Sequence, residues 1–257
     1  MLEDHYGDVT LLRFERLARE EGLAHAVTAG PQNYAPHRGR GADQAVAHRR
    51  RVCELLGVDF EKLTSPAQVH GAELLALEEG DIGKGRDGRG SAVPFVDGLI
   101  CDSPGVPIIL LSGDCPLICA FDPARKVMGA VHASWQGTVA GAAGQLIRQM
   151  ARRFGCDPAG LLVGIAPSAG PCCYEVGPEV RRIALGRYDD AESWFRPRRD
   201  RFILDLWSAN KGQLLAAGVE LANIETAGLC TICDRRFWSH RRDGSEAGRF
   251  ALFLAIR

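Results

Sequence analysis

The sequence has no excess of charge of either sign. Its 31 lysines and arginines are balanced by 32 aspartates and glutamates, so the formal net charge is −1. Non-specific binding of nucleic acid depends on a broadly basic surface, and this balance argues against a nucleic-acid partner. The arginines clustered between Arg235 and Arg249 do not change that expectation, because the chain as a whole has no basic field.

Long apolar runs are also lacking. No run approaches the roughly 20 residues that cross a membrane, so no membrane partner is expected. The first residues, MLEDHYGDVTLLRFERLARE, are acidic and mixed, whereas a signal peptide is basic and then apolar. No repeat, linker or shift in composition divides the chain. We therefore expect residues 1–257 to form a single domain that is cytoplasmic and monomeric.

Cysteine is present in a number that does not suggest a disulfide framework. There are nine cysteines, and an odd number without an export signal favours reduced thiols or metal ligands. Four of them lie in apolar segments typical of a core, namely Cys53, Cys101, Cys119 and Cys156. The adjacent Cys172 and Cys173 are interpreted as pocket wall, because neighbouring side chains reach one tetrahedral metal site only with strain. Cys230-x-x-Cys233 has no second motif of its kind beside it and is given a structural role.

Hydrophobic periodicity alternates between the patterns of strand and helix. Helical spacing predicts helices at Val9–Glu21, Ala42–Leu56, residues 139–154, from Pro178 onward, and Asp205–Ala217. Short apolar runs predict strands at Gly98–Cys101, Pro107–Leu111, Leu117–Phe121, Val127–His132, Leu161–Ile165, Arg201–Leu204, Ile224–Gly228 and Phe250–Ile256. Because strands and helices are interleaved, the predicted class is α/β, with a mixed β-sheet core flanked by helices.

Two of the predicted strands flank the turn-forming segment Asp122–Lys126. The pattern predicts a β-hairpin that folds about Pro123 and Ala124. In that register Cys115 and His132 face one another, with Cβ atoms roughly 4.5–5.5 Å apart. This separation suits two ligands of one zinc ion.

His70 is the candidate for a third ligand. It stands in SPAQVHGAE and is followed by glycine, which allows a ligand or backbone to approach closely. Three protein ligands leave one position open, as in catalytic zinc sites. Asp114, beside Cys115, is the nearest carboxylate in sequence and a candidate partner of a ligand histidine, a proton acceptor, or simply a strand cap. We expect Asp114 and Cys115 to carry the catalytic role.

Five segments occur in order along the chain: SPAQVHG, DGLICDSPGVPIILLSGDCPLICAFD, VMGAVHASWQGTVAG, APSAGPCCYEVGPEV and LCTICDRRFWSHRRDGSEAGRF. Together they resemble the purine nucleoside phosphorylase family, whose members were formerly described as polyphenol oxidases or laccase-domain proteins. The resemblance runs from about His25 to the C-terminus. Five ordered motifs are far more specific than any one of them.

The resemblance implies that His70, Cys115 and His132 bind zinc. It implies cleavage of adenosine or inosine by phosphate, giving free base and ribose 1-phosphate, with methylthioadenosine phosphorolysis and adenosine deamination as related activities. The partners would then be small molecules, a purine nucleoside and phosphate. Copper is the metal of the older description, but the sequence lacks the additional histidine pairs that a multicopper centre requires.

Four residues are expected to bind substrate. Asn33 keeps the family's place in the N-terminal loop, and Arg242 and Arg249 belong to the basic segment near the C-terminus. Gln136 stands where the family motif His-Ala-Gly-Trp-Arg-Gly has arginine, and His240 stands where tyrosine is frequent. The change at Gln136 removes a permanent charge and a bidentate donor suited to phosphate.

Two other functions remain open at this point. In the first, Cys115 is the nucleophile and His132 the base of a Cys/His hydrolase of the amidase type. In the second, the chain binds zinc without phosphorylase turnover, because phosphate handling was lost at Gln136. Metal content separates the first from a phosphorylase, and turnover separates the second.

Overall fold

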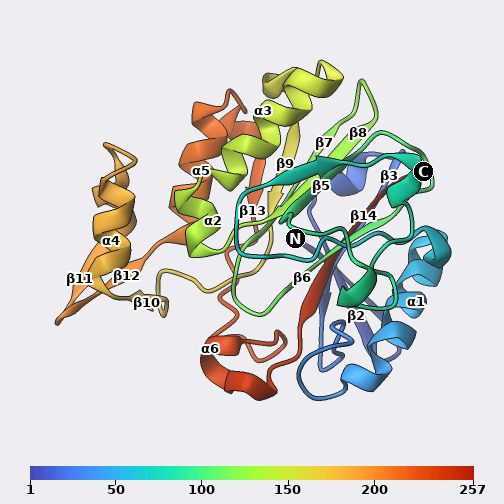
Figure 1. Ribbon diagram of the computed structural model, residues 1–257, viewed down its shortest axis with the longest axis horizontal. Helices are drawn as coiled ribbons and strands as arrows, with labels where there is room; N and C mark the ends of the chain where they lie inside the picture. The colour runs from blue at the N-terminus through green and yellow to red at the C-terminus, as the bar shows by residue number, and fades with distance from the viewer.

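The computed structural model describes residues 1–257, and two β-sheets stacked face to face form its centre (Figure 1). The first sheet has five strands in the order β1-β2-β3-β14-β6, and all neighbours are antiparallel. Its strands are β1 (Leu2–Tyr6), β2 (Val9–Arg13), β3 (Leu23–Ala29), β14 (Phe250–Ile256) and β6 (Ile108–Ser112). The C-terminal strand thus lies in the middle of this sheet.

The second sheet has six strands in the order β13-β9-β7-β8-β5-β4. Its strands are β13 (Ile224–Thr226), β9 (Leu162–Ile165), β7 (Leu117–Asp122), β8 (Val127–His132), β5 (Gly98–Cys101) and β4 (Leu74–Ala76). The outer pairs β13/β9 and β4/β5 are parallel, and the inner pairs are antiparallel. The prediction of an α/β chain with a mixed sheet is confirmed.

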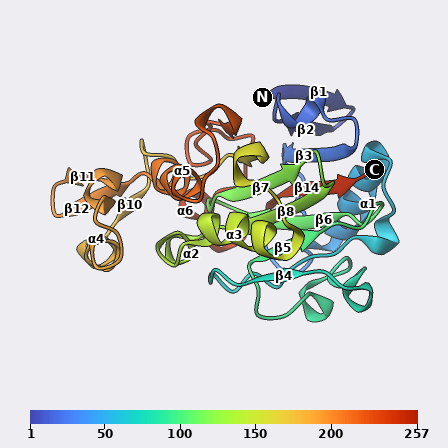
Figure 2. The ribbon, with the colours of Figure 1, turned by 90° about the horizontal axis from the view of Figure 1, so that it is seen from above.

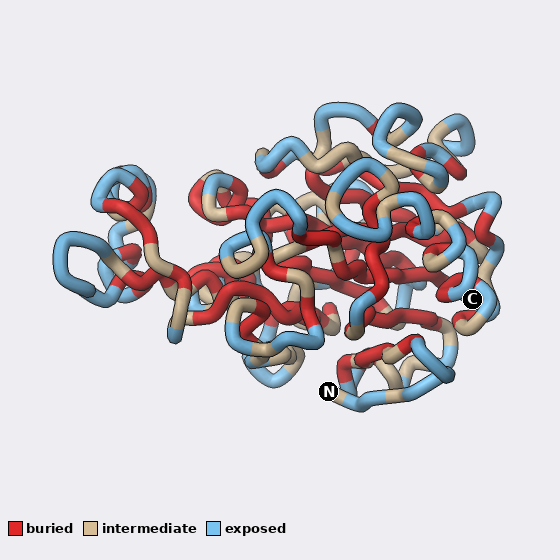
Figure 3. Tube along the Cα trace, turned by 90° about the horizontal axis from the view of Figure 1, so that it is seen from below, coloured by how far each residue is buried: buried red, intermediate tan, exposed pale blue.

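Strands in both sheets are buried on their two faces. In β7, Leu117, Cys119 and Phe121 face the other sheet, whereas Ile118 and Ala120 pack toward the helices α3 (Ala142–Phe154) and α5 (Leu206–Ala216). Helix α1 (Ala45–Leu56) covers the outer face of the five-stranded sheet. The central strands are therefore buried throughout (Figure 3). This explains why they are continuous apolar runs in the sequence, with no polar alternation.

A smaller lobe extends from one end of the sheets (Figures 1 and 2). It consists of the sheet β10-β12-β11 and one helix, with bounds β10 (Glu175–Val176), α4 (Pro178–Leu185), β11 (Phe195–Arg198) and β12 (Arg201–Leu204). The lobe has its own apolar cluster around Trp194, which also includes Val139 of α2 (Trp135–Val139) and Tyr174. No helix anywhere in the chain combines the length and the hydropathy needed to cross a bilayer.

One predicted helix is wrong, and several strands were not predicted. Residues 9–21 form β2 and a short 3-10 turn at Leu17–Arg19 instead of a helix. Their apolar residues divide between two faces: Leu12 and Leu17 point into the space between the sheets, and Val9 and Leu11 point toward α1. A strand buried on both faces produces apolar spacings that mimic a helix. The strands β1, β3 and β4, with lengths of three to seven residues, were missed for the same lack of a two-residue period.

Candidate metal centre and pocket

Three ligand-type side chains meet at one end of the six-stranded sheet. A nitrogen of His70, Sγ of Cys115 and a nitrogen of His132 all lie within 4.8 Å of one another. His132 is the last residue of β8, Cys115 stands two residues before β7, and His70 lies in the loop before β4. The two imidazole rings are 5.0 Å apart and nearly perpendicular.

The hairpin that joins β7 and β8 forms as predicted, but its register differs by two residues. Leu117, not Cys115, is the cross-strand partner of His132. The pairing continues past the strand ends, because the N–H of Ala133 donates to the carbonyl of Pro116 at 2.8 Å. Cys115 therefore reaches His132 diagonally from the chain just ahead of the strand. The two residues meet although the predicted reason was wrong.

A single carboxylate, that of Asp97, positions two of the three side chains. Asp97 is completely buried at the start of β5. Its Oδ1 accepts hydrogen bonds from Nδ1 of His132 at 2.9 Å and from the N–H of His70 at 3.0 Å. Its Oδ2 accepts from the N–H groups of Gly71 and Val69. Because the carboxylate accepts at Nδ1, the Nε2 atom of His132 keeps its lone pair for a metal ion.

The loop that carries His70 has an unusual backbone because of these contacts. His70 has φ 65° and Gln68 has φ 51°, both in the left-handed region. Three successive N–H groups turned toward one carboxylate require such a conformation, which forms an anion-binding nest. The amide of Gln68 also bonds both backbone groups of Leu111 at the end of β6. The loop is thus anchored to both sheets.

The charges of the three residues suit a cation. Burial raises the pKa of the Cys115 thiol, but the neighbouring His132 and His70 outweigh burial and lower the pKa to about 6. Burial lowers the pKa of His132, but Cys115 and Asp97 outweigh it and raise the pKa to about 9. A thiolate and two imidazoles form an S/N donor set that zinc prefers. The residues present therefore fit a zinc ion with one open position.

The three side chains open into a cavity of about 530 Å³. This volume lies within the range of small-molecule sites. Arg38, Arg89, Arg241 and Arg249 line the cavity together with only one carboxylate, that of Asp114. The side chains of Arg38 and Arg89 form no hydrogen bond or ion pair within the chain, so their guanidinium groups are available to an anionic ligand.

Of the other residues predicted for the site, Asp114, Gln136 and Arg249 line this cavity. Asp114 does not contact a ligand histidine. Its Oδ1 accepts from the hydroxyl of Thr231 at 2.7 Å, and its Oδ2 accepts from the N–H of Arg241 at 2.6 Å. Asp97, which the sequence reasoning missed, holds the histidine. The available signal was a carboxylate directly before a fully apolar strand, where burial demands partners.

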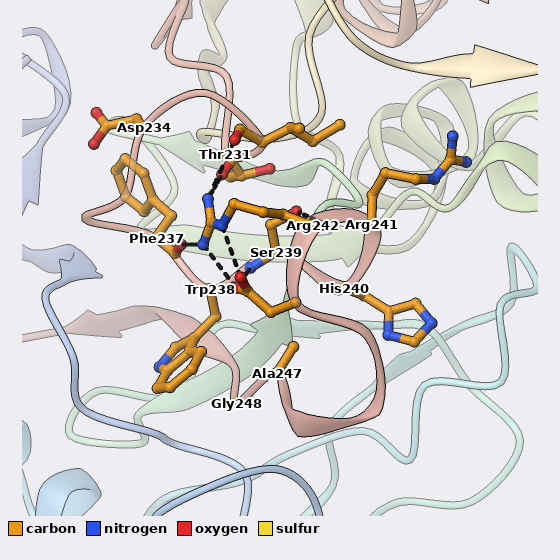
Figure 4. A network of polar contacts seen from close by, with 12 residues as sticks. Thr231, Asp234, Phe237, Trp238, Ser239, His240, Arg241, Arg242, Ala247 and Gly248 are labelled. Carbon is orange, nitrogen blue, oxygen red and sulfur yellow. Dashed lines mark hydrogen bonds and ion pairs between the residues drawn. The ribbon is translucent and has the colours of Figure 1, made fainter.

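Asn33 and Arg242 are not among the residues that line the cavity. The buried amide of Asn33 donates to the carbonyls of Arg38 and Arg40 and accepts from the N–H of Arg249, so it shapes the loop that carries Arg38. The guanidinium of Arg242 donates to the carbonyls of Thr231 and Phe237 and pairs with Asp243 (Figure 4). Its neighbour Arg241 points the other way and lines the cavity instead.

Comparison with known proteins agrees with this arrangement. Residues 16–257 match the family model described as "Multi-copper polyphenol oxidoreductase laccase". The chain belongs to this family. It is 37% identical over 229 residues to the purine nucleoside phosphorylase YlmD of Geobacillus stearothermophilus, with 88% of this chain and 83% of that protein covered. The crystal structure of YlmD from the same organism superposes with a TM-score of 0.90, at 32% identity over 99% of this chain and 98% of that one.

A second kind of activity occurs among the relatives. The chain is 30% identical over 220 residues to a protein named adenosine deaminase RL5, from an unknown prokaryotic organism, with 84% of each protein covered. Purine nucleoside phosphorylase of Bacteroides thetaiotaomicron is 29% identical over 97% of both chains. The names of family members thus support enzymes that act on purine nucleosides.

Proposed function

We propose that this protein is a zinc-dependent purine nucleoside phosphorylase that cleaves adenosine or inosine with phosphate. The observation that carries the proposal is the convergence of His70, Cys115 and His132 at a cavity whose charged lining is almost entirely cationic. The names of the relatives supply the nucleoside, and the chemistry of the cavity supplies the anion site. Methylthioadenosine phosphorolysis and adenosine deamination are proposed as further activities, the second by analogy with RL5.

His70, Cys115 and His132 would hold the metal. A bound zinc ion would supply Lewis-acid polarisation and an open coordination position. Zinc is proposed in preference to copper because one thiolate with two imidazoles in a three-residue group is the donor set of a catalytic zinc site. Asp97 would keep His132 oriented with Nε2 toward the ion.

In phosphorolysis a phosphate oxygen forms a bond to C1′ of the ribose while the C1′–N9 bond breaks. The electron pair leaves with the purine, which takes up a proton. The ribose passes through an oxocarbenium-like state, so the anion must be fixed close to a developing positive charge. We assign the fixing of phosphate to Arg38, Arg89 and Arg249, and the cavity wall beside the nucleoside to Tyr174 and Trp135.

These arginines compensate for Gln136. The arginine that the family motif places at this position is absent, but Gln136 is exposed and lines the same cavity. Its neutral amide offers phosphate two donor hydrogens without a permanent charge. We therefore expect phosphate to bind more weakly than it would beside an arginine at this position. The protein is proposed to act as a cytoplasmic monomer.

Metal analysis combined with nucleoside assays tests the proposal. The purified protein and a Cys115→Ala variant are assayed with adenosine and inosine, with and without phosphate, and ribose 1-phosphate is quantified. We expect phosphate-dependent base release by the parent, and loss of about one zinc equivalent together with turnover in the variant. Cys156→Ala, which removes a buried thiol outside the site, is the matched control and should behave as the parent.

A cysteine hydrolase is the second candidate function, and a specific observation favours it. Without a metal ion, the low pKa of Cys115, the high pKa of His132 and the hydrogen bond from His132 to Asp97 form a nucleophile, base and orienting acid. The same metal analysis separates the two functions. Parent protein without zinc at this site, inert toward nucleosides under any added metal and rapidly alkylated at Cys115, would sink the phosphorylase and favour the hydrolase.

A further inference from the structure

Four more cysteines converge beside the cavity, outside the centre described above. Cys172 and Cys173 come from the turn before β10, and Cys230 and Cys233 come from the segment after β13. All four Sγ atoms lie within 4.8 Å of one another. The Sγ atom of Cys233 is 3.1 Å from that of Cys173 and 3.6 Å from that of Cys172. Sequence reasoning took the two cysteine pairs as unrelated, and the fold brings them together.

Backbone contacts place the two cysteine pairs side by side. Ser168 and Cys230 form a parallel bridge, and the N–H of Thr231 donates to the carbonyl of Ser168 at 3.0 Å. The N–H of Gly170 donates to Sγ of Cys230 at 3.3 Å. Each pair is then turned inward by its own tight turn, since the N–H of Cys233 donates to the carbonyl of Cys230. The cluster therefore follows from the backbone and is not a chance contact of flexible side chains.

We propose that these four thiols bind a second zinc ion, as a closed structural centre. Zn–S bonds of about 2.3 Å in a tetrahedron require sulfur atoms about 3.8 Å apart. The observed separations of 3.1 Å and 3.6 Å, with all others below 4.8 Å, bracket that value. Both thiols of the vicinal pair reach the cluster, so the strain expected for adjacent ligands does not separate them. Cys172 and Cys233 are exposed, which gives the ion a path from solvent.

A disulfide fits this arrangement less well than a metal ion. A disulfide joins two sulfur atoms about 2.05 Å apart and would leave the other two thiols unused. All nine cysteines are free in this structure, and the two sulfurs that lie nearest each other in the cluster are 3.1 Å apart. Four thiols around one point are the ligand set of structural zinc centres.

The second ion would hold the wall of the cavity. Tyr174, which lines the cavity, directly follows Cys173. Thr231, between Cys230 and Cys233, donates its hydroxyl to Asp114, the neighbour of Cys115. Arg242 clamps the same turn through the carbonyls of Thr231 and Ile232. The cluster is therefore a positioning element, one step removed from the cavity on two sides.

Cobalt substitution in a Cys115→Ala chain gives a direct test. This variant removes the only thiol of the first centre, so sulfur-to-cobalt charge transfer in the full chain then reports on the four-cysteine cluster alone. We expect about one cobalt equivalent with the intense absorption of a tetrathiolate site. Adding Cys172→Ser, an exposed position, should weaken that absorption, whereas adding Cys156→Ala should leave it unchanged.

Zinc analysis of the otherwise unmodified protein provides the second measurement. We expect about two zinc equivalents in the parent and about one in Cys172→Ser/Cys233→Ser. A Cys115→Ala chain without thiolate absorption, or a parent whose zinc content is unaffected by Cys172→Ser/Cys233→Ser, would overturn the proposal. So would a Cys173–Cys233 disulfide found by mass spectrometry in metal-free protein. None of these readouts depends on nucleoside turnover, so failure of the proposed phosphorylase activity would leave this test intact.

Discussion

Asp97 accepts four hydrogen bonds and so determines the positions of both histidines at the candidate metal centre. Burial opposes its ionisation, but the hydrogen bonds from His132 and from the loop N–H groups hold its pKa below the usual value. A buried carboxylate with this many donors remains charged. Its negative charge also supports the cation that the three ligands are proposed to bind.

Asp97→Asn should therefore weaken the metal centre without removing a ligand. An asparagine has one acceptor oxygen, and its amide hydrogens would face the N–H groups of the loop. Partners of ligand histidines typically contribute 10- to 100-fold to metal affinity, and we expect a loss of about that size. Competition with a chromophoric chelator measures it. Asp122→Asn, at a buried carboxylate in the β7–β8 turn, is the control, and an equal loss there would contradict the role of Asp97.

His25 makes folding sensitive to acid. It is 2% exposed, and its Nε2 accepts the N–H of Phe14 at 3.0 Å. Burial, with a smaller contribution from Arg13, lowers its pKa from 6.5 to about 4. Above pH about 6.5 the side chain is neutral in the folded and the unfolded chain. As the pH falls toward 4, only the unfolded chain takes up the proton, so stability is lost over this interval.

We expect this histidine alone to cost roughly 2 kcal/mol of unfolding free energy between pH 7 and pH 5. His25→Gln retains an acceptor near the position of Nε2 but does not titrate, so its stability should fall by that much less over the same interval. Urea unfolding of both chains at the two pH values measures the difference. Parallel pH profiles would show that His25 is protonated in the folded chain.

Helix α2 packs against the loop that carries His70 at the scale of whole elements. The hydroxyl of Ser134 caps the helix by accepting the N–H of Gly137 and also donates to the carbonyl of His70 at 3.2 Å. A Cβ atom on Gly137 would lie 2.5 Å from the carbonyl oxygen of Gly71. The helix and the loop are therefore as close as a glycine allows. This contact explains the glycine at a helical position, where alanine has the higher propensity.

Gly137→Ala should force α2 and the loop apart. The clash is with backbone, so overpacking of about 1–3 kcal/mol should exceed the gain of about 1 kcal/mol in helix propensity. We expect lower stability and weaker metal binding together, because the displaced loop carries His70. Thermal unfolding and chelator competition measure the two effects. Gly160→Ala, where an added Cβ meets nothing within 4 Å, should change neither, and metal affinity equal to the parent in Gly137→Ala would contradict the coupling.

Over the whole molecule, the stacked sheets and the outlying lobe have separate apolar clusters. The lobe is organised by Trp194, which is 4% exposed and packs on Tyr188 with ring centroids 4.9 Å apart. Tyr174 belongs to the lobe's cluster and also lines the cavity. The lobe therefore has its own source of stability and a direct connection to the site.

Trp194→Ala should unfold the lobe while the sheets stay folded. Removing a buried tryptophan costs about 3–5 kcal/mol, which is comparable to the stability of a small sub-domain. Hydrogen exchange should accelerate in residues 175–204 and remain slow in β7, β8 and β14. Phe253→Ala, in the buried centre of the five-stranded sheet, serves as the comparison and should accelerate exchange throughout. Equal acceleration in the sheets of the Trp194→Ala chain would show one cooperative unit.

Much of the fold could be predicted because most strands and helices announce themselves locally. The runs Gly98–Cys101, Val127–His132 and Phe250–Ile256 form strands with the predicted bounds, and α1 and α3 follow their helical spacing. Residues 9–21 could not be assigned correctly, since burial on two faces removes the two-residue period of a strand. The second sheet also could not be foreseen, because the pairing of β14 with β3 and β6 joins segments from both ends of the chain.

The sequence by itself determined the α/β class, the family and the three ligand-type residues, because residue types and their order within motifs are local properties. Only the tertiary structure decided what surrounds them. It showed that Asp97 holds His70 and His132, that Arg241 and not Arg242 lines the cavity, and that two separate cysteine pairs form one cluster. Each of these depends on contacts between residues far apart in the chain, which backbone pairing and burial fix and local sequence does not encode.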